Sequence, residues 1–307
     1  MPSPSRFSGA STALATAPPS RDIPGHQSTS PIKAVEHIRR MRGGSQSHLM
    51  RCSDGHYYVV KFQNNPQDRR VLVNELLGTL LARLLGLPTA TPEVVCVCDE
   101  LIRLTPELCI ELPRSRVPCQ SGPQFGSRYV GDPRRHVAFD LFPDALVGQV
   151  DNLSYFAGML IFDKWTCNTD GRQVVFQRSG LKYKAVMIDQ GFCFNSGDWS
   201  FPDAPLRGRY ARTCVYDCIL GIDDFEPWLS RLETQIDEYA IRECTAEIPP
   251  EWYDSDTDAL ARLLDTLNRR RSRVRELLWS AQRSSNEFLR NWVCRNAFAT
   301  AESETGD

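Results

Sequence analysis

The sequence predicts an α+β fold of two lobes, in which a small antiparallel-sheet lobe with one long helix precedes a larger helical lobe. Three observations favour this fold class. Residues 48–62 alternate apolar and polar side chains around a turn, which is typical of a β-hairpin. Residues 65–87 repeat leucines at helical spacing, and helical patterns dominate from about residue 144 onward. A chain of 307 residues is long enough for two lobes around a cleft.

The first lobe is expected over about residues 31–143, and its first elements surround a glycine-containing loop. The basic segment PIKAVEHIRRM (31–41) has a helix-like pattern. The strands HLMRC and YYVVKF then form the hairpin, whose turn Ser-Asp-Gly places Gly55 where a positive φ is needed.

A long helix follows, and further strands complete the first lobe. Asn65-Pro66 can begin this helix and Gly86, followed by Pro88, can end it. The segments expected to be strands are EVVCVC (93–98), CIEL (109–112) and, together with their connector, QFGSRYV to HVAFDLF (124–142).

The second lobe is expected over about residues 144–300. Residues 144–165 are apolar with helical spacing, and two short strands, 174–178 and YKAVMID (183–189), flank a tight turn at Ser179-Gly180. Several helices, interrupted by IPPEW, follow from residue 223 to about 298. The lobes together form one domain over residues 31–300.

The N-terminal segment and the composition restrict the class of protein. Residues 1–30 are rich in Pro and Ser and are expected to be a disordered tail, with a transit peptide as the alternative. The net charge of −2 does not favour nucleic acid or an anionic membrane as a partner. No apolar run is long enough for a transmembrane helix or resembles a secretory signal, so a cytoplasmic location is expected.

The chain has 11 cysteines, but none of them has the C-x-x-C spacing of a zinc site. Reduced, mostly buried thiols are therefore the favoured interpretation.

The first candidate for chemistry is the loop Gly43-Gly44-Ser45-Gln46-Ser47 before the hairpin. Two glycines let a backbone approach a ligand closely, and successive N–H groups can cradle a phosphate. The hydroxyls of Ser45 and Ser47 add donors. A plain loop at a hairpin edge remains the alternative, because the pattern matches neither a P-loop nor a dinucleotide-binding fingerprint.

The second candidate is Lys61, at the end of YYVVK, together with Glu75 on the helix that follows. A lysine held by a helical glutamate can bind α- and β-phosphates. The alternative is that both side chains lie on solvated surfaces.

The third candidate is the polar stretch FDKWTCNTDGRQVVF, between a helix and a strand. Asp170 could accept a proton from a hydroxyl, although Asp-Gly is also a common turn pair. The side-chain oxygen of Gln173 could bind Mg²⁺. Arg172 could bind a phosphate or pair with a neighbour, whereas Asp163 and Asn168 are expected only to fix the loop.

The fourth candidate is Asp189, at the end of the apolar strand in VMIDQGF. Because strand, turn and strand separate it from Asp170, the hairpin would bring both carboxylates to one mouth. Two acids in such a position repel each other unless a divalent ion lies between them.

The order of the glycine loop, Lys61, Glu75, Asp170 and Asp189 is that of a protein-kinase-like fold. FDKWTCNTDGRQVVF followed by MIDQGF also resembles the HipA-like kinase domain, over roughly residues 30–295. These domains are bacterial relatives of the HipA serine/threonine kinases and are distantly similar to phosphatidylinositol kinases.

The resemblance implies phosphoryl transfer that depends on ATP and Mg²⁺. It makes Asp170 the catalytic residue, Asp189 a metal ligand, Lys61 the phosphate-binding lysine, and Gly44 and Ser45 part of the phosphate loop. Val175 stands where many relatives have a metal-binding Asn, so Gln173 is the nearest amide that could replace it.

The acceptor is expected to be a hydroxyl group, with protein Ser/Thr favoured over a lipid or a metabolite. A pseudokinase, which binds nucleotide without turnover, remains the alternative function. The sequence contains no DNA-binding motif.

Overall fold

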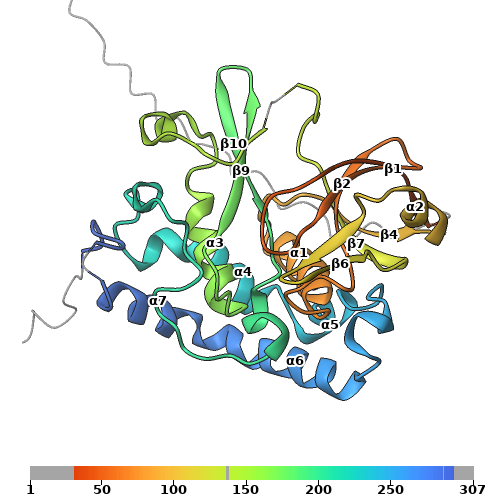
Figure 1. Cartoon of the computed structure of the whole chain (residues 1–307). Helices are drawn as coiled ribbons and strands as arrows, with labels where there is room; N and C mark the ends of the chain where they lie inside the picture. The colour runs from red at the N-terminus through yellow and green to blue at the C-terminus, as the bar shows by residue number, and fades with distance from the viewer. Residues whose placement is uncertain (1–30, 136–137, 286, 294–307) are drawn as a thin grey trace, which may run out of the picture. The chain divides into compact units, whose positions relative to one another are not determined.

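The first half of the described chain builds a closed β-barrel, drawn in red to yellow in Figure 1. The computed structural model describes residues 31–135, 138–285 and 287–293, so the expected tail (1–30) and the end of the expected domain (294–300) lie outside the described residues. The barrel has the strand order β1-β2-β3-β7-β4. Its strands are β1 (Ile32–Arg40), β2 (His48–Cys52), β3 (Tyr57–Lys61), β4 (Pro92–Val97) and β7 (Gly122–Arg128). The α+β class is thereby confirmed.

The helix-like prediction for residues 31–41 is wrong, because this segment is strand β1. It pairs antiparallel with β2 and parallel with β4, where Ile32 lies opposite Val95. Each of these pairings gives the backbone N–H and C=O groups of β1 a partner, which the local side-chain pattern does not reveal.

The predicted hairpin is present as β2 and β3, and Gly55 in its turn has φ +80°. Met50, Tyr58 and Val60 are buried in a core inside the barrel. Because side chains alternate along a strand, Val59 and Lys61 face the opposite side. This outer face of β3 forms one wall of the candidate site.

The predicted long helix is α1 (Val71–Leu84), and it is buried along most of its length. It ends before Gly86, which has φ +79° as expected for a residue after a helix. The helix begins later than Asn65, whose side chain instead holds a turn: its Nδ2 donates to the carbonyl of Phe62 at 2.9 Å.

Short elements lie between the barrel strands β4 and β7 or, in the case of β8, after β7. They are α2 (Asp99–Leu104), the hairpin of β5 (Cys109–Leu112) and β6 (Ser115–Pro118), and β8 (Ala138–Phe139). The strands expected at 93–98 and 109–112 are confirmed. The region 124–142, expected to contain strand and connector, holds most of β7 and all of β8, and its residues 136–137 lie outside the described part.

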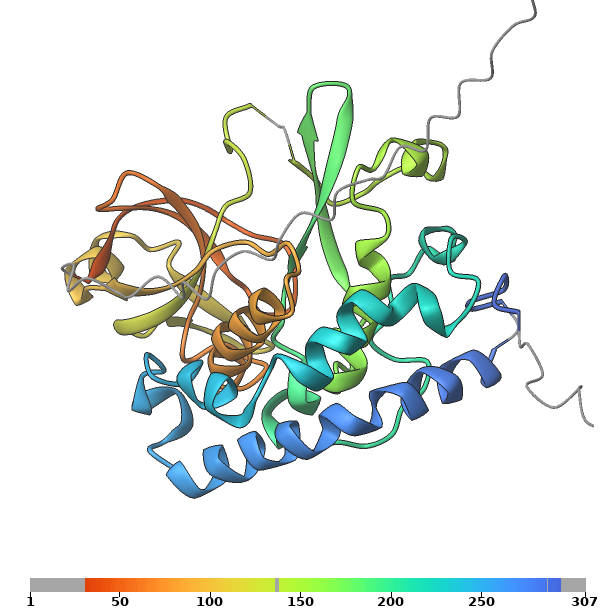
Figure 2. The ribbon, with the colours of Figure 1, turned by 180° about the vertical axis from the view of Figure 1, so that it is seen from behind.

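The expected helical run over residues 144–165 is divided into two helices. A 3₁₀ helix, η1 (Asp144–Gln149), precedes α3 (Tyr155–Trp165), whose residues are nearly all buried. After α3 come β9 (Gln173–Ser179) and β10 (Lys182–Ile188), which pair antiparallel and extend with β8 to a three-stranded sheet. In Figure 2 the β9–β10 hairpin projects on the side opposite α6 and α7.

The remainder of the described chain forms helices joined by irregular segments, and the helices expected from residue 223 onward are present. Its elements are η2 (Cys193–Asp198), η3 (Thr213–Tyr216), η4 (Ile222–Phe225), α4 (Glu226–Thr234), α5 (Glu238–Glu243), η5 (Pro250–Tyr253), α6 (Thr257–Arg270), η6 (Arg271–Arg273) and α7 (Val274–Arg283). One large apolar core joins α1, α3 and these helices. Within the described ranges, no helix combines the length and the apolar character that crossing a membrane requires. The ten described cysteines are free thiols.

Candidate active site

One cavity of about 590 Å³ lies between the barrel and the β9–β10 hairpin. Its volume falls within the range of small-molecule sites, about 300–1,000 Å³. Nine of the residues that the sequence singled out line it: Gly43, Gly44, Ser45, Ser47, Lys61, Glu75, Asp170, Gln173 and Asp189. They come from five separate segments of the chain, so the fold and not the sequence order brings them together.

A buried ion triad centred on Lys61 forms the floor of the cavity. The Lys61 ammonium contacts the Glu75 carboxylate and lies 2.9 Å from Oδ1 of Asp189. Only 8% of the Lys61 side chain is exposed. Burial alone would lower the pKa of Lys61, but the carboxylates of Asp189 and Glu75 outweigh that effect and raise the pKa above its ordinary value. Lys61 therefore stays charged inside the protein.

The two carboxylates of the triad have different environments. Burial raises the pKa of Glu75 above its usual range, although Lys61 acts in the opposite direction. Burial also acts against the charged form of Asp189, yet Lys61 beside it holds the pKa of that carboxyl below its usual range. Asp189 is thus held in its ionised form where it lines the cavity.

Glu75 also fixes the segment that carries Asp189. Its second carboxylate oxygen accepts a hydrogen bond from the backbone N–H of Gln190 at 2.9 Å. Gly191 packs so tightly on α1 that a Cβ there would lie 2.8 Å from Cγ1 of Val71. Helix α1 thereby holds the end of β10 in one position.

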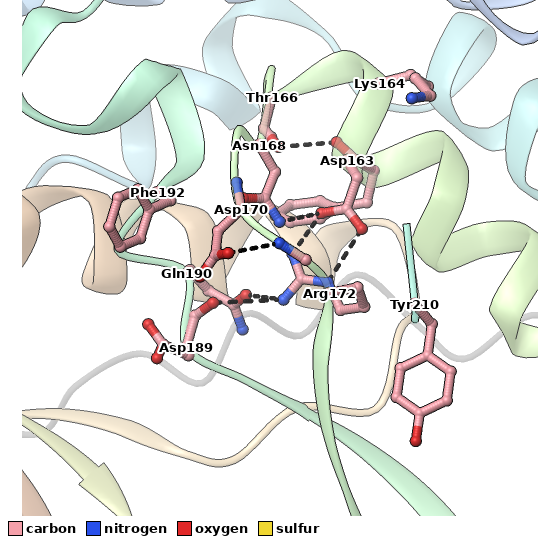
Figure 3. Close-up of polar contacts among 12 residues, drawn as sticks. Asp163, Lys164, Thr166, Asn168, Asp170, Arg172, Asp189, Gln190, Phe192 and Tyr210 are labelled. Carbon is pink, nitrogen blue, oxygen red and sulfur yellow. Dashed lines mark hydrogen bonds and ion pairs between the residues drawn. The ribbon is translucent and has the colours of Figure 1, made fainter. Parts of the chain in front are cut away.

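Asp189 itself has a left-handed backbone, with φ +58°. Non-glycine residues in this region are uncommon and cluster at functional sites. The turn directs the carboxylate toward Lys61, and Figure 3 shows it pointing away from Arg172.

The glycine loop joins β1 to β2 above this floor. Gly43 has φ +120°, which only glycine adopts without strain, and its carbonyl accepts from the N–H of Gln46 at 3.2 Å. The Gln46 side chain then ties the loop to β5: Nε2 donates to the carbonyl of Glu111 at 2.8 Å, and Oε1 accepts from the N–H of Glu111 at 2.7 Å. Ser45 and Ser47 are buried.

Of the two roles left open for Arg172, the structure shows pairing with a neighbour. Its guanidinium forms a fully buried ion pair with Asp163, in which Nε lies 3.0 Å from Oδ2. It also donates to Oε1 of Gln190 at 2.5 Å and to the carbonyl of Ile188 at 3.1 Å. Figure 3 shows this cluster joining the end of α3 to the end of β10. Asn168, which donates to Asp163 at 2.9 Å, completes the predicted loop anchor.

Asp170 presents an exposed side chain on a fixed backbone. Its N–H donates to Oδ1 of Asn168 at 3.1 Å, and its carbonyl accepts from the N–H of Gly208 at 3.1 Å. Gly208 has φ +66°, and a Cβ there would lie 2.8 Å from the Asn168 carbonyl oxygen. The Asp170-Gly171 pair also makes a local turn-type contact, in which the Gly171 N–H donates to the Asp170 carboxylate at 2.7 Å. This contact agrees in part with the alternative of an Asp-Gly turn.

Gln173 begins β9 directly opposite Ile188, the residue before Asp189. Its exposed amide and the Asp189 carboxylate therefore line the same part of the cavity. Oxygen ligands of this kind suit Mg²⁺, which keeps several waters and needs few protein ligands. Across the described ranges, no group of three or more His, Cys, Asp or Glu side chains is placed to hold a metal ion.

The structure changes the electrostatic argument for the acid pair. Asp170 and Asp189 line one cavity, as expected, but the nearest cation to Asp189 is Lys61. A divalent ion is therefore not needed to compensate Asp189 in this state, and its presence stays a prediction.

Other residues that line the cavity were not found from the sequence: Arg39, Arg42, Gln67, Asp140 and Phe192. Arg39 and Arg42 both precede the glycine loop, and this proximity in the sequence is the one signal that could have indicated them. Asp140 and Phe192 carry no such signal, because they reach the site only through the fold.

A glycine loop over a buried lysine–glutamate pair, with separate acids on the loop after α3 and at the end of β10, defines the class of kinase-type phosphotransferases. A sequence model of HipA-like kinases matches residues 34–190, and the chain belongs to this family.

Solved kinase structures resemble the chain at low sequence identity. The proinflammatory kinase CtkA of Helicobacter pylori is 13% identical with a TM-score of 0.48, over 81% of this chain and 97% of that one. A Golgi casein kinase is 14% identical with a TM-score of 0.48, over 83% and 75%. HipA of Shewanella oneidensis MR-1, in a complex with HipB and operator DNA, is 10% identical with a TM-score of 0.45, over 84% and 76%. No curated protein sequence matches the chain.

Proposed function

We propose that this protein transfers the γ-phosphate of ATP to a hydroxyl group in a reaction that depends on Mg²⁺. The observation that carries the proposal is the buried triad, in which Lys61 lies between Glu75 and Asp189 at the floor of the cavity. A lysine held in this way is a fixed positive charge for α- and β-phosphates. Placing two carboxylates beside a lysine inside the protein is costly, and a lysine that only faced solvent would not require it.

We propose that the two parts of a nucleotide occupy different parts of the cavity, here called its polar end and its apolar end. Lys61, Ser45 and the backbone of Gly43 and Gly44 lie at the polar end, where the triphosphate would bind. The apolar end is the part lined by the side chains of Val59, Val175 and Ile188, which suit a flat nucleobase.

Asp189 and Gln173 would hold Mg²⁺, whose charge would offset the charge on the phosphate oxygens. Asp170, exposed on its fixed loop, would accept a hydrogen bond from the acceptor hydroxyl and take its proton. Since the Asp163–Arg172 pair fixes both ends of this arrangement, alignment of the acceptor with the phosphate would contribute most of the rate enhancement.

The acceptor is proposed to be a protein Ser or Thr, as in the family that the sequence resembles. A lipid or metabolite hydroxyl is an outcome of the same assay, in which labelled ATP is incubated with protein, lipid and small-molecule fractions.

The test compares wild type with Asp170→Asn and Asp189→Ala. Asp170→Asn should keep ATP binding and lower turnover by ~10²-fold or more, in the range of general-base effects. Asp189→Ala should lose the Mg²⁺-dependent part of ATP binding. Asp151→Asn is the matched control, because this exposed acid pairs with Lys182 at 2.8 Å outside the cavity. Phosphorylation by Asp170→Asn at the wild-type rate would remove Asp170 from the proposed role.

A pseudokinase is the second candidate, and the valine at position 175 favours it. Val175 lines the cavity with an apolar side chain, whereas many relatives have a metal-binding Asn at this position. Thermal stabilisation by ATP with Mg²⁺, without label transfer to any acceptor, would support this candidate. The predictions of no nucleic-acid partner and of a cytoplasmic location are likewise proposals that the described residues do not test.

A further inference from the structure

We propose that Arg39 stacks its guanidinium on the nucleobase and makes the site selective for a nucleotide over a bare polyphosphate. This inference rests on the proposed function and adds a specificity-determining residue to it. It starts from the register of the barrel strands, which places Arg39 at the apolar end of the cavity.

Three strand pairings place Arg39 on the same face of the sheet as the cavity. Arg39 lies opposite Leu49, Leu49 opposite Val59, and Val59 opposite Ser127. Directly opposed residues of antiparallel strands present their side chains on one face. Arg39, Val59 and Ser127 all line the cavity, so this row forms the wall on the barrel side of its apolar end.

The row of Arg39, Val59 and Ser127 is separated from the phosphate end by two residues along β3. Lys61 lies two residues beyond Val59 on β3, and a strand rises about 3.3 Å per residue. The row that contains Arg39 is therefore roughly 7 Å from the row that contains Lys61. A cation at this distance lies beside the base end of the cavity and not over the phosphates.

The opposite wall is apolar and comes from the β9–β10 hairpin. Val175 and Ile188 line the cavity there and are half-buried, and both lie close to the start of β9 or the end of β10. A planar group between this wall and the row of Arg39 would present one face to aliphatic side chains and the other to the guanidinium.

The Arg39 side chain is available for such a contact. It is exposed, and the described part of the chain offers it no hydrogen-bond, ion-pair or ring partner. Its neighbour Arg40 is different, because it donates to Gln46 at 2.5 Å and pairs with Glu111 at 2.8 Å. A guanidinium is planar, weakly hydrated and well suited to stack on aromatic rings.

The test separates the base from the phosphates. The Kd values of Mg-ATP and of Mg-tripolyphosphate are measured by calorimetry for wild type, Arg39→Ala, Arg39→Lys and Arg42→Ala. Arg42 is the matched arginine, because it is also exposed and lines the cavity but directly precedes Gly43.

Arg39→Ala should weaken ATP binding by about 3- to 10-fold, in the range of cation–π contacts, and leave tripolyphosphate binding unchanged. Arg39→Lys should recover little of this loss, because the ammonium lacks the planar fork. Arg42→Ala should weaken both ligands by the same factor.

Three results would overturn the inference: an equal loss for both ligands in Arg39→Ala, an unchanged ATP affinity in that variant, or full recovery in Arg39→Lys. A wild-type protein that binds neither ligand would instead contradict the proposed function. An unchanged Tm of Arg39→Ala would show that the variant is folded, as expected for an exposed side chain.

Discussion

Replacing Asp163 by asparagine would leave the Arg172 guanidinium buried without a counter-charge. Neither side chain has any exposed surface, and the guanidinium also donates to the side chain of Gln190 and to the carbonyl of Ile188. Burial alone would lower the pKa of Arg172, but Asp163 raises it above its ordinary value, so the arginine cannot escape the cost by deprotonating.

The magnitude follows from this burial. Removal of one partner from a buried ion pair costs about 3–5 kcal/mol of the free energy of unfolding. Domains of 150–250 residues lose about 2–4 °C in Tm per kcal/mol, so Asp163→Asn should lower Tm by at least ~6 °C. Arg172→Met should cause a loss of similar size, because it leaves the Asp163 carboxylate uncompensated.

The assay is urea unfolding followed by tryptophan fluorescence, for which the fully buried Trp165 at the end of α3 is a local reporter. The two single variants are measured together with the double variant. Because both residues belong to one cluster, the loss in the double variant should be smaller than the sum of the single losses by about 1–3 kcal/mol.

The control is the exposed pair of Asp151 and Lys182, for which Asp151→Asn should change stability by less than about 1 kcal/mol. Losses that add without coupling, or a loss in Asp163→Asn no larger than in this control, would refute the argument that the buried pair fixes the loop.

Two further predictions concern buried charges near the barrel. Lys61→Met removes the cation between Glu75 and Asp189, so both carboxylates should titrate at higher pH. The loss of unfolding free energy relative to wild type, measured by urea unfolding, should therefore be smaller at pH 5 than at pH 7.5. An equal loss at the two pH values would contradict this prediction. His48 is buried, and its burial, with His37 and Arg40, lowers its pKa from 6.5 to about 4. Between these values the unfolded chain binds more protons, so the His48 contribution is complete above pH 6.5 and is lost as pH falls toward 4. His48→Gln should therefore reduce the loss of stability between pH 7.5 and pH 5 by about 1 kcal/mol, measured as urea midpoints, and an unchanged pH dependence would contradict this assignment.

Local patterns were sufficient where the chemistry depends on a residue's place at the end of an element. Lys61 ends β3 and Asp189 follows β10, and both positions are visible from apolar strands that stop at a charge. Gly55 was visible because a positive φ restricts the residue type, and its φ is +80°.

Strand β1 was missed because its partners are distant in sequence. Ile32 and Lys33 pair with Val95 and Cys96, and this parallel pairing closes the barrel. A basic segment with mixed spacing carries no local signal of such a pairing, since strand formation depends on neighbours across the sheet. The missed strand also concealed Arg39, whose place in the cavity depends on the register of β1.

The partner of Arg172 was left open for a related reason. Arg172 lies between an exposed Asp170 and an exposed Gln173, so the local pattern gives equal support to a ligand contact. Only the packing of α3 against the start of β9 shows that the side chain turns inward to Asp163.

The triad gives Lys61 two roles that must be reconciled in the proposed reaction. In this structure Lys61 compensates Asp189 and Glu75, whereas in the reaction it would bind phosphate and Asp189 would bind Mg²⁺. A phosphate that arrived alone would add negative charge beside two carboxylates and the exposed Asp170. A metal ion that arrived alone would compete with Lys61 for Asp189. Because each charge removes the obstacle to the other, nucleotide and Mg²⁺ should stabilise the site together far better than either does separately.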